Sequence, residues 1–383
     1  MSDITQEVPD WRGGWLNRLV ARPGFQRWAS RFPLTRGQAR RDGALLFDVV
    51  QGFVQSQVLM AVVELDLLRR LRGGPVSPEM LGRATGIAPD RMRILLQAAA
   101  ALKLIRRKRS GDYVLARKGA ALMGVPGLEA MIRHHRAFYA DLADPVALLR
   151  GPEETELSQF WPYVFGAKGE IDPGVAETYS DLMAQSQLLV AEDTLRTVSF
   201  KGVRHLLDVG GGTGAFLEAV GRAYPDLRLS LFDLPQVVPG ATSRFDAAGM
   251  MDRVTLSPGS FRDDPLPDGA DAVSLIRVLY DHADETVADL LASVYAALPA
   301  GGRLVISEPM GGGAQPDRAG DVYFAFYTMA MQTGRTRSAE EIAALCATAG
   351  FSNIRCPHPA RNYVTRVVTA QKPGSPSQCV NSS

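Results

Sequence analysis

A glycine-rich segment in the middle of the chain carries the pattern expected of a nucleoside-binding site. Residues 206–214 read Leu-Leu-Asp-Val-Gly-Gly-Gly-Thr-Gly, and Asp233 follows at the end of the next apolar run. Glycine allows the chain to turn with a positive φ and allows a ligand to approach the main chain. An acid about 20 residues further on is placed to bind ribose hydroxyls. The sequence therefore predicts a nucleoside cofactor beside Gly210 and Gly212.

The glycines alone do not identify the cofactor, because Gly210-x-Gly212-x-x-Ala215 also satisfies the loose dinucleotide pattern. Three features argue against NAD. Asp208 precedes the glycines inside the strand, where it can bind a cationic group. The motif also follows a helical region instead of opening the chain. A strand pair near the C-terminus predicts a seventh, antiparallel strand, which dinucleotide-binding sheets usually lack.

The elements that must position this site follow from the hydrophobic periodicity. Apolar runs predict strands at 204–209, 227–233, 253–257, 271–277 and 302–308, and helical patterns occupy 214–223, 235–248, 284–298 and 338–349. Such alternation predicts a parallel sheet with helices on both faces. Two final runs, 352–356 and 363–370, are separated only by a loop, so we expect them to pair antiparallel at an edge.

The preceding region has a different pattern. Helical periodicity covers 46–72, 77–84 and 89–104, and two short strands flank a polar turn within 106–115, which is the winged-helix arrangement. A recognition helix needs polar side chains aimed at base edges. The helix at 89–104 instead carries mainly aliphatic residues and alanines. We therefore expect no nucleic-acid partner, and a DNA-binding regulator is kept only as the non-enzyme alternative.

Composition places few further limits on function. The formal net charge is +1, and the three cysteines show no metal-ligand spacing, so neither a metal site nor a disulfide framework is expected. No early apolar segment and no run of about 20 uninterrupted apolar residues is present. A cytoplasmic protein is the expected class.

The N-terminal arm, residues 1–41, is basic and aromatic. Residues 11–41 contain eight arginines and no acid, interleaved with Trp11, Trp15, Phe25, Trp28 and Phe32. Aromatic and basic side chains together are typical of segments that lie on anionic lipid, which would make the protein peripheral on the cytoplasmic membrane face. An arm packed on a partner subunit explains the same composition.

Several motifs in order resemble one enzyme family. They are Asp-Val-Gly-Gly-Gly-Thr-Gly (208–214), Phe-Asp-Leu-Pro (232–235), Gly-Ser-Phe (259–261), Pro-Leu-Pro-Asp-Gly-Ala-Asp (265–271), Arg-Val-Leu-Tyr-Asp-His-Ala-Asp-Glu (277–285) and Val-Ile-Ser-Glu-Pro (305–309). Over roughly 45–372 the chain resembles S-adenosylmethionine (SAM)-dependent O-methyltransferases of the caffeate and acetylserotonin type.

The resemblance implies an α/β fold of the class I methyltransferase kind, with a Rossmann-like, seven-stranded sheet whose last strand is antiparallel. It also implies a mainly helical, winged-helix-like dimerisation domain, an intertwined homodimer and SAM as cofactor. The expected division is an arm at 1–41, a dimerisation domain at 42–170, a SAM-binding domain at 171–372 and a disordered tail at 373–383.

The resemblance also assigns roles to cofactor-binding residues, which add to Asp208. It places Gly210 and Gly212 beside the methionine part of SAM and Asp233 on its ribose. Leu234 and Phe261 would flank the adenine, Arg277 would lie near it, and Ser260 replaces the aspartate usual at that position.

The residues expected around the reacting atoms depart from the family pattern. Tyr280 occupies the position of the family's catalytic histidine, and His282 stands where a tryptophan usually follows. Glu308 matches an acid that orients the family's base, whereas Thr336 replaces a second acid. A free tyrosine has a pKa of about 10, so Tyr280 is a poor base. His282 is therefore a candidate base, and a histidine satisfied at a strand end is the alternative.

The acceptor is expected to be large and apolar, because aromatic and thioether side chains suit such ligands. A buried helix uses the same side chains, so core packing is the alternative. The Leu-Tyr-Asp-His variant resembles the pigment branch of the family, which implies a hydroxylated acyclic carotenoid as acceptor. A polyketide or aromatic metabolite, and a bacteriochlorin methylated on carbon, are the other candidates. The proposed pocket residues are Trp161, Phe165, Met183, Tyr323, Phe326, Tyr327 and Met331.

Overall fold

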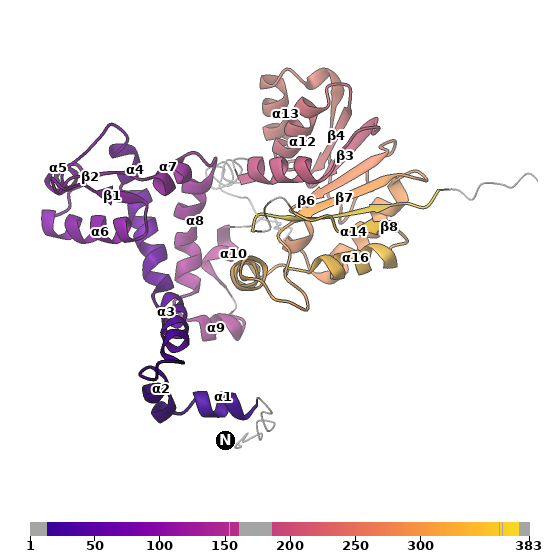
Figure 1. Ribbon diagram of the computed structural model, residues 1–383. Helices are drawn as coiled ribbons and strands as arrows, with labels where there is room; N and C mark the ends of the chain where they lie inside the picture. The colour runs from indigo at the N-terminus through magenta and orange to yellow at the C-terminus, as the bar shows by residue number, and fades with distance from the viewer. Residues whose placement is uncertain (1–13, 153, 161–185, 360, 362, 375–383) are drawn as a thin grey trace, which may run out of the picture. The chain divides into compact units, whose positions relative to one another are not determined.

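The computed structural model describes residues 14–152, 154–160, 186–359, 361 and 363–374. The predicted pocket residues Trp161, Phe165 and Met183 lie outside this range, as does most of the predicted tail. The chain divides into two compact units, Met1–Ala120 and Ala121–Ser383 (Figure 1). The boundary predicted at 170 falls outside the described residues and stays a prediction.

The first unit confirms the winged-helix arrangement. Ser77 caps a helix by accepting the N–H of Met80 at 3.2 Å, and Gly86 ends the same helix with φ +71°. The two short strands then pair antiparallel. In order, the elements are α1 (Trp15–Val20), α2 (Pro23–Ala29), α3 (Arg36–Glu64), α4 (Leu67–Arg70), α5 (Pro78–Thr85), α6 (Pro89–Ala101), β1 (Ile105–Arg107) and β2 (Tyr113–Leu115).

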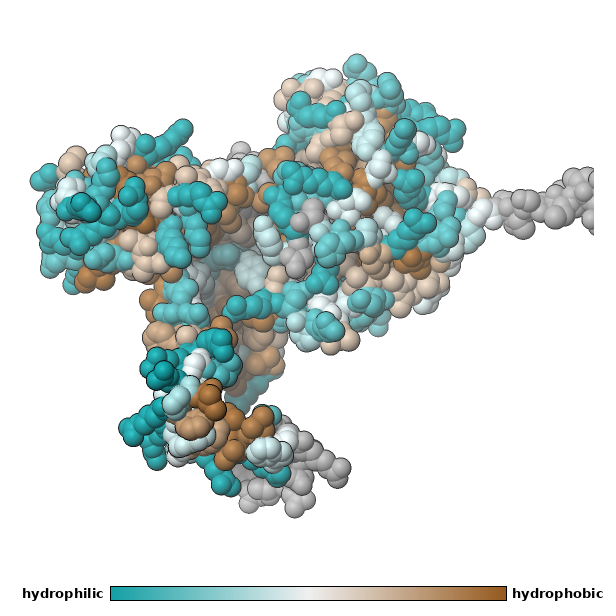
Figure 2. All heavy atoms as spheres, in the orientation of Figure 1, coloured by the Kyte–Doolittle hydropathy of each residue, from teal (hydrophilic) through white to brown (hydrophobic). Residues whose placement is uncertain are grey.

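The long helix α3 leaves an apolar face uncovered within this chain. Among the described helices it is the one long and apolar enough to cross a membrane by length and composition, and only 17% of its most apolar window is buried. Figure 2 shows apolar surface gathered over the N-terminal helices of this unit. The exposed large apolar side chains on α3 are Leu45, Leu46, Phe47, Val49, Val50, Phe53 and Val54.

The second unit contains the predicted sheet. Its strand order is β5-β4-β3-β6-β7-β9-β8, with every pairing parallel except those of β9. The final two strands pair antiparallel as expected, and β9 lies between β7 and β8. The strands are β3 (His205–Val209), β4 (Arg228–Asp233), β5 (Val254–Pro258), β6 (Ala272–Ile276), β7 (Arg303–Glu308), β8 (Ser352–Arg355) and β9 (Arg366–Gln371).

The sheet helices also fall where periodicity predicts them, and the described residues after 138 are partly helical. A helix also covers 186–197. The remaining helices are α7 (Arg117–Met123), α8 (Leu128–Asp141), α9 (Pro145–Leu149), α10 (Glu156–Phe160), α12 (Ala215–Ala223), α13 (Val238–Ala247), η1 (Met251–Arg253), η2 (Leu279–Asp281), α14 (Asp284–Ala297), η3 (Arg318–Phe324), α15 (Ala325–Met331) and α16 (Ala339–Thr348).

Alternate strand residues face opposite sides of the sheet and enter different cores. Leu207 and Leu275 pack with residues of α14 and α16, whereas Leu206 and Leu229 pack with residues of α12 and α13. A separate apolar cluster joins α8, α9, α10 and α15. The order of the strands changes direction between β3 and β6, and ligands of open α/β sheets bind at the carboxyl ends of the strands at such a switch point.

Candidate active site

The glycine turn begins directly after β3. Gly212 has φ +59°, and a Cβ built there would meet no heavy atom within 4 Å. Gly214 has φ +78°, and its Cβ would lie 2.6 Å from the Phe245 ring. The turn therefore needs glycine at both positions for different reasons: open main chain at Gly212, and close packing of α12 on α13 at Gly214.

Asp233 is held rigidly opposite this turn at the carboxyl end of β4. Its Oδ2 accepts the N–H of Gly212 at 2.7 Å, and its Oδ1 accepts the N–H of Leu234 at 2.7 Å. Burial raises the pKa of Asp233, and the two N–H groups oppose this shift. The strand-end acid and the open glycine are thus joined directly, which is the geometry that a ribose-binding carboxylate requires.

The surroundings of Asp208 show whether this site suits a cofactor that carries positive charge. It is fully buried in β3, and its Oδ1 accepts the hydroxyl of Ser274. Its Oδ2 is buried and has no hydrogen-bond partner among the described residues, and it lies 2.6 Å from where a Cβ of Gly211 would be. Burial raises its pKa to about 7. An unpaired carboxylate oxygen facing the turn fits a cofactor that carries positive charge.

Ser260, Phe261 and His282 form another part of this edge. The Ser260 hydroxyl accepts the N–H of Arg262 at 3.2 Å, so the turn already uses it. The rings of Phe261 and His282 meet edge to face, with centroids 5.2 Å apart. His282 thus packs against the side chain predicted to flank adenine.

The environment of His282 favours the structural interpretation over a basic role. Its Nδ1 lies 3.0 Å from Nη2 of Arg262. A guanidinium only donates, so Nδ1 accepts and Nε2 carries the proton. Burial, followed by the charges of Arg262 and Arg337, lowers the pKa of His282 to about 4. The ring is therefore neutral near pH 7 and presents no free basic nitrogen.

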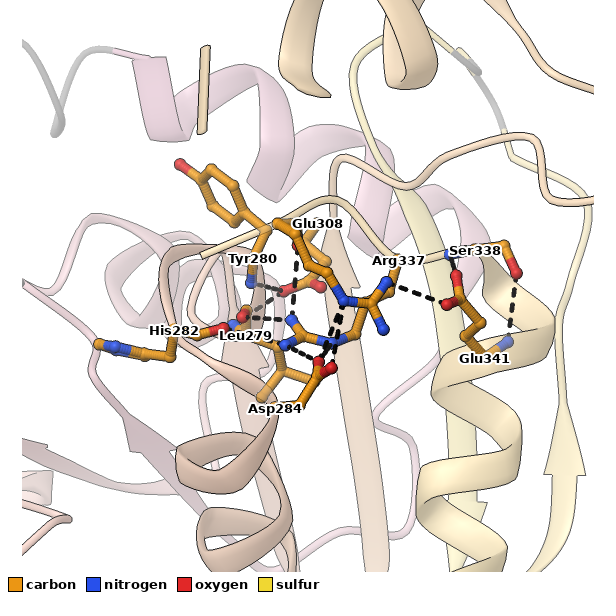
Figure 3. A network of polar contacts seen from close by, with 9 residues as sticks. Leu279, Tyr280, His282, Asp284, Glu308, Arg337, Ser338 and Glu341 are labelled. Carbon is orange, nitrogen blue, oxygen red and sulfur yellow. Dashed lines mark hydrogen bonds and ion pairs between the residues drawn. The ribbon is translucent and has the colours of Figure 1, made fainter. Parts of the chain in front are cut away.

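Glu308 holds the turn that carries Tyr280. Its Oε2 accepts the N–H of Leu279 at 2.9 Å and that of Tyr280 at 3.3 Å. The side chain is wholly buried, and burial raises its pKa to about 8, against the opposing charge of Arg337. Figure 3 shows the rings of Tyr280 and His282 pointing away from this network in different directions. Glu308 therefore orients the backbone of the turn instead of a basic side chain.

Arg337 clamps the same turn from the other side and was missed in the sequence. It is wholly buried and donates to the carbonyls of Leu279 at 2.8 Å and His282 at 2.9 Å, and to the carboxylate of Asp284 (Figure 3). A Cβ at nearby Gly334 would lie 2.0 Å from the Tyr280 carbonyl, so the two segments touch main chain to main chain. The sequence analysis singled out the adjacent Thr336, where the family usually has an acid, but no local pattern in the sequence indicates a role for Arg337.

The Tyr280 hydroxyl faces a cation. Nη2 of Arg277 lies 3.3 Å from it, and Nη1 of Arg277 donates to the Ser186 hydroxyl at 2.8 Å. Burial raises the pKa of Tyr280 above its ordinary value, so the phenol stays protonated. Burial also raises the pKa of Asp281, to about 7. The predicted contact of Arg277 with adenine stays a prediction, since its guanidinium is directed here to Tyr280.

The predicted acceptor wall contains two histidines that sequence reasoning missed. Tyr327 and Met331 are buried in the cluster around Phe138, and Tyr323 and Phe326 pack against it. The hydroxyls of Tyr323 and Tyr327 bond to the adjacent histidines of α8, His135 and His134. This doublet holds two of the five histidines in the chain, and that was the available signal. Within the described ranges, no group of three or more His, Cys, Asp or Glu could hold a metal.

Comparison with known proteins agrees with this geometry. Residues 139–352 match the O-methyltransferase domain model, and residues 47–123 match the O-methyltransferase dimerisation domain model. The chain is 57% identical to demethylspheroidene O-methyltransferase of Cereibacter sphaeroides over 370 residues, covering 95% of this chain and 98% of that protein. It is 55% identical to the enzyme of the same name from Rhodobacter capsulatus, covering 95% and 91%.

A solved structure supports the cofactor assignment. The S-adenosylhomocysteine (SAH)-bound form of CalO1, a methyltransferase in calicheamicin biosynthesis, superposes with a TM-score of 0.73 at 26% identity, covering 87% of this chain and 98% of that one. The chain belongs to the SAM-dependent O-methyltransferase family. SAM as cofactor and the class I fold are confirmed, and the dimerisation domain supports the predicted homodimer.

Proposed function

We propose that this chain methylates the hydroxyl of demethylspheroidene, a hydroxylated acyclic carotenoid. The carrying observation is the 57% identity, over 95% of the chain, to an enzyme named for that acceptor. The site supports the same class of acceptor, because Tyr280 replaces the histidine that relatives use on acidic phenols. Methylation of a carotenoid is favoured over the polyketide, aromatic and bacteriochlorin alternatives.

The residues divide the work between holding SAM and holding the acceptor. Asp233 would bind the ribose of the cofactor. Gly212 would let the methionine part approach the main chain, and the unpaired oxygen of Asp208 would bind the positive charge. When bound, SAM supplies an activated methyl group on a sulfonium. Glu308 and Arg337 fix the turn of Tyr280, so that its phenol is presented at a constant position. Such alignment of two reactants is itself a large part of catalysis.

The test is turnover with purified acceptors. We expect transfer of labelled methyl from SAM to demethylspheroidene in detergent or liposomes, at a kcat/KM at least about 100-fold above that for a panel of phenols, flavonoids and bacteriochlorins. SAH should bind by calorimetry whatever the acceptor. Preferential methylation of a phenol or a bacteriochlorin would overturn the proposed acceptor while leaving the family intact.

We also propose that the N-terminal helices bring the enzyme to the cytoplasmic face of an anionic membrane, where such an acceptor dissolves. Trp15, Trp28 and Phe32 are exposed, and the rings of Trp28 and Phe32 stack with centroids 4.7 Å apart. Arg27 and Arg31 lie beside the stacked rings. Exposed aromatic rings next to cations suit the headgroup region of a lipid surface.

Vesicle binding tests the membrane proposal with the full chain. Replacing Arg27 and Arg31 by glutamine should lower the affinity for phosphatidylglycerol vesicles, measured by co-sedimentation, about 30-fold, since each of the two basic residues contributes about 1 kcal/mol near such a surface. The matched control replaces Arg106 and Arg107 of β1, which are also exposed. Equal binding by the two double variants would contradict the proposal, because Arg27 and Arg31 would then contribute no more to vesicle binding than other exposed arginines.

A further inference from the structure

Two adjacent histidines of α8 reach two tyrosines that lie one helical turn apart. Nε2 of His135 is 2.6 Å from the Tyr323 hydroxyl, and Nε2 of His134 is 2.8 Å from the Tyr327 hydroxyl. Burial lowers the pKa of both histidines to about 4, and burial raises the pKa of both phenols above the ordinary value. Both partners of each pair are therefore neutral, and the tautomer of the imidazole decides which one donates: with the imidazole proton on Nδ1, the phenol donates to Nε2.

The two pairs differ in access. Tyr327 is 5% exposed and lies inside the apolar cluster, whereas Tyr323 is half-buried. Tyr323 belongs to η3, a π-helical segment, and π-helical turns are rare and occur often at functional sites. Tyr280 and Arg277 lie near enough to Tyr323 to affect its pKa, although burial is the main cause of the shift. Of the two tyrosines, Tyr323 is the one that is both partly exposed and close to Tyr280 and Arg277.

A phenol that donates to a neutral imidazole keeps its oxygen lone pairs for another donor. An acceptor alcohol can therefore donate its O–H to the Tyr323 oxygen, while the Tyr323 proton points at Nε2 of His135. His282 does not offer this arrangement, because its Nδ1 accepts from Arg262. Tyr280 differs in its partners, because Arg277 donates to its oxygen and its hydroxyl bonds to the Asp281 carboxyl instead of to an imidazole.

We propose that Tyr323 binds the acceptor hydroxyl and passes its proton to His135 during methyl transfer. This assignment rests on the proposed function. Tyr323 is the catalytic residue that touches the acceptor, and His135 is the positioning residue that receives the proton through it. Tyr327 and His134 form the same hydrogen bond as part of the buried scaffold.

The proton moves late in the reaction. The alcohol oxygen forms a bond to the methyl carbon as the bond from that carbon to the sulfonium sulfur breaks, which leaves neutral SAH and a protonated ether. The ether oxygen gives its proton to the Tyr323 oxygen, and the Tyr323 proton goes to Nε2 of His135, which becomes an imidazolium and later releases it to water. An alcohol proton becomes strongly acidic only once the new bond forms, so a weak base is sufficient.

The experiment compares matched variants of the full-length enzyme with demethylspheroidene. Tyr323→Phe should lower kcat about 100-fold, within the range for loss of a proton-transfer group, with SAH affinity unchanged. His135→Gln can accept the Tyr323 hydrogen bond but cannot take the proton, so kcat should fall about as far while KM changes little. The controls Tyr363→Phe and His358→Gln, at exposed residues outside the site, should lower kcat less than about threefold.

Rescue separates proton acceptance from structural support. In His135→Ala, added imidazoles should restore turnover, and more basic imidazoles should restore it faster. Nitrogen NMR of the cofactor-free wild-type protein at pH 7 should show His135 neutral with its proton on Nδ1. Full activity of Tyr323→Phe, or an absence of rescue in a folded variant that binds SAH, would overturn the assignment. Failure of the wild-type enzyme to methylate the carotenoid would overturn the proposed function instead.

Discussion

The predicted cofactor edge, at Asp233 and Gly212, and the predicted acceptor side, at the turn of Tyr280, are built in different ways. At the cofactor edge, Asp233 bonds to the main-chain N–H of Gly212, and both follow neighbouring strands of one sheet. On the acceptor side, the turn of Tyr280 is clamped by Glu308 from β7 and by Arg337 from the segment before α16. The cofactor edge is a local motif, whereas the turn of Tyr280 is held by buried charged side chains from segments far apart in the sequence. Substitutions should therefore separate cofactor affinity from turnover.

The largest effect is expected from Arg337→Met. The substitution removes every donor that Arg337 offers to Leu279, His282 and Asp284, and it leaves buried carbonyls unpaired. The free energy of unfolding should fall by about 3 kcal/mol, measured by urea denaturation. At a temperature where the variant is folded, turnover should fall while SAH affinity stays within about threefold.

The matched control is Arg335→Met. Arg335 also pairs with Asp284, but its side chain is 47% exposed, so its loss should cost less than about 1 kcal/mol. Equal destabilisation by the two substitutions would show that the clamp depends on surface charge and not on burial.

At the cofactor edge, Asp233→Ala should weaken SAH binding about 100-fold by calorimetry. The carboxylate would accept the ribose hydroxyls, and each hydrogen bond to a charged group contributes about 1.5–3 kcal/mol. It also holds the glycine turn through the N–H of Gly212. Asp246→Ala, at an exposed carboxylate on α13, serves as control. An Asp233→Ala enzyme that binds SAH normally but has lost turnover would reverse the division between the two regions.

Glu308→Gln should change how stability depends on pH. Burial raises the pKa of Glu308 to about 8 from 4.5, so its contribution is present below pH 4.5 and is lost as pH rises through 8. Glutamine resembles the protonated acid and does not titrate. The unfolding free energy of the variant should therefore rise relative to that of the wild type as the pH increases from 5 to 8.5. A constant difference across this range would mean that Glu308 is ionised throughout.

Tyr280→Phe should have the smallest effect. The hydroxyl receives one long hydrogen bond, 3.3 Å, from Arg277, and Glu308 holds the main chain of the turn rather than the phenol. We expect kcat/KM for the acceptor to fall about fivefold, which corresponds to about 1 kcal/mol. Tyr363→Phe, at an exposed tyrosine, is the control. A loss of several hundredfold would place the proton transfer at Tyr280.

The sequence predicted the sheet, its antiparallel end, the winged-helix unit and the place of Asp233 at the end of the strand after the glycine turn, because each depends on local periodicity or spacing. It did not predict that Arg337 clamps the turn of Tyr280, or that His135 meets Tyr323, because each contact joins segments far apart in the chain. His282 illustrates the limit well. A histidine at a family position suggested a base, and only the contact with Arg262 shows which nitrogen is occupied.

The exposed face of α3 has a consequence for how this enzyme must be handled. Part of α3 lies within the matched dimerisation domain, and the apolar side chains from Leu45 to Val54 lie open in a single chain. If a second copy covers them, assembly and folding are one equilibrium, so the melting temperature should rise with protein concentration. Dilution to nanomolar assay conditions would then inactivate the enzyme without heat, and added apoprotein defective in SAM binding would restore the activity of its partner.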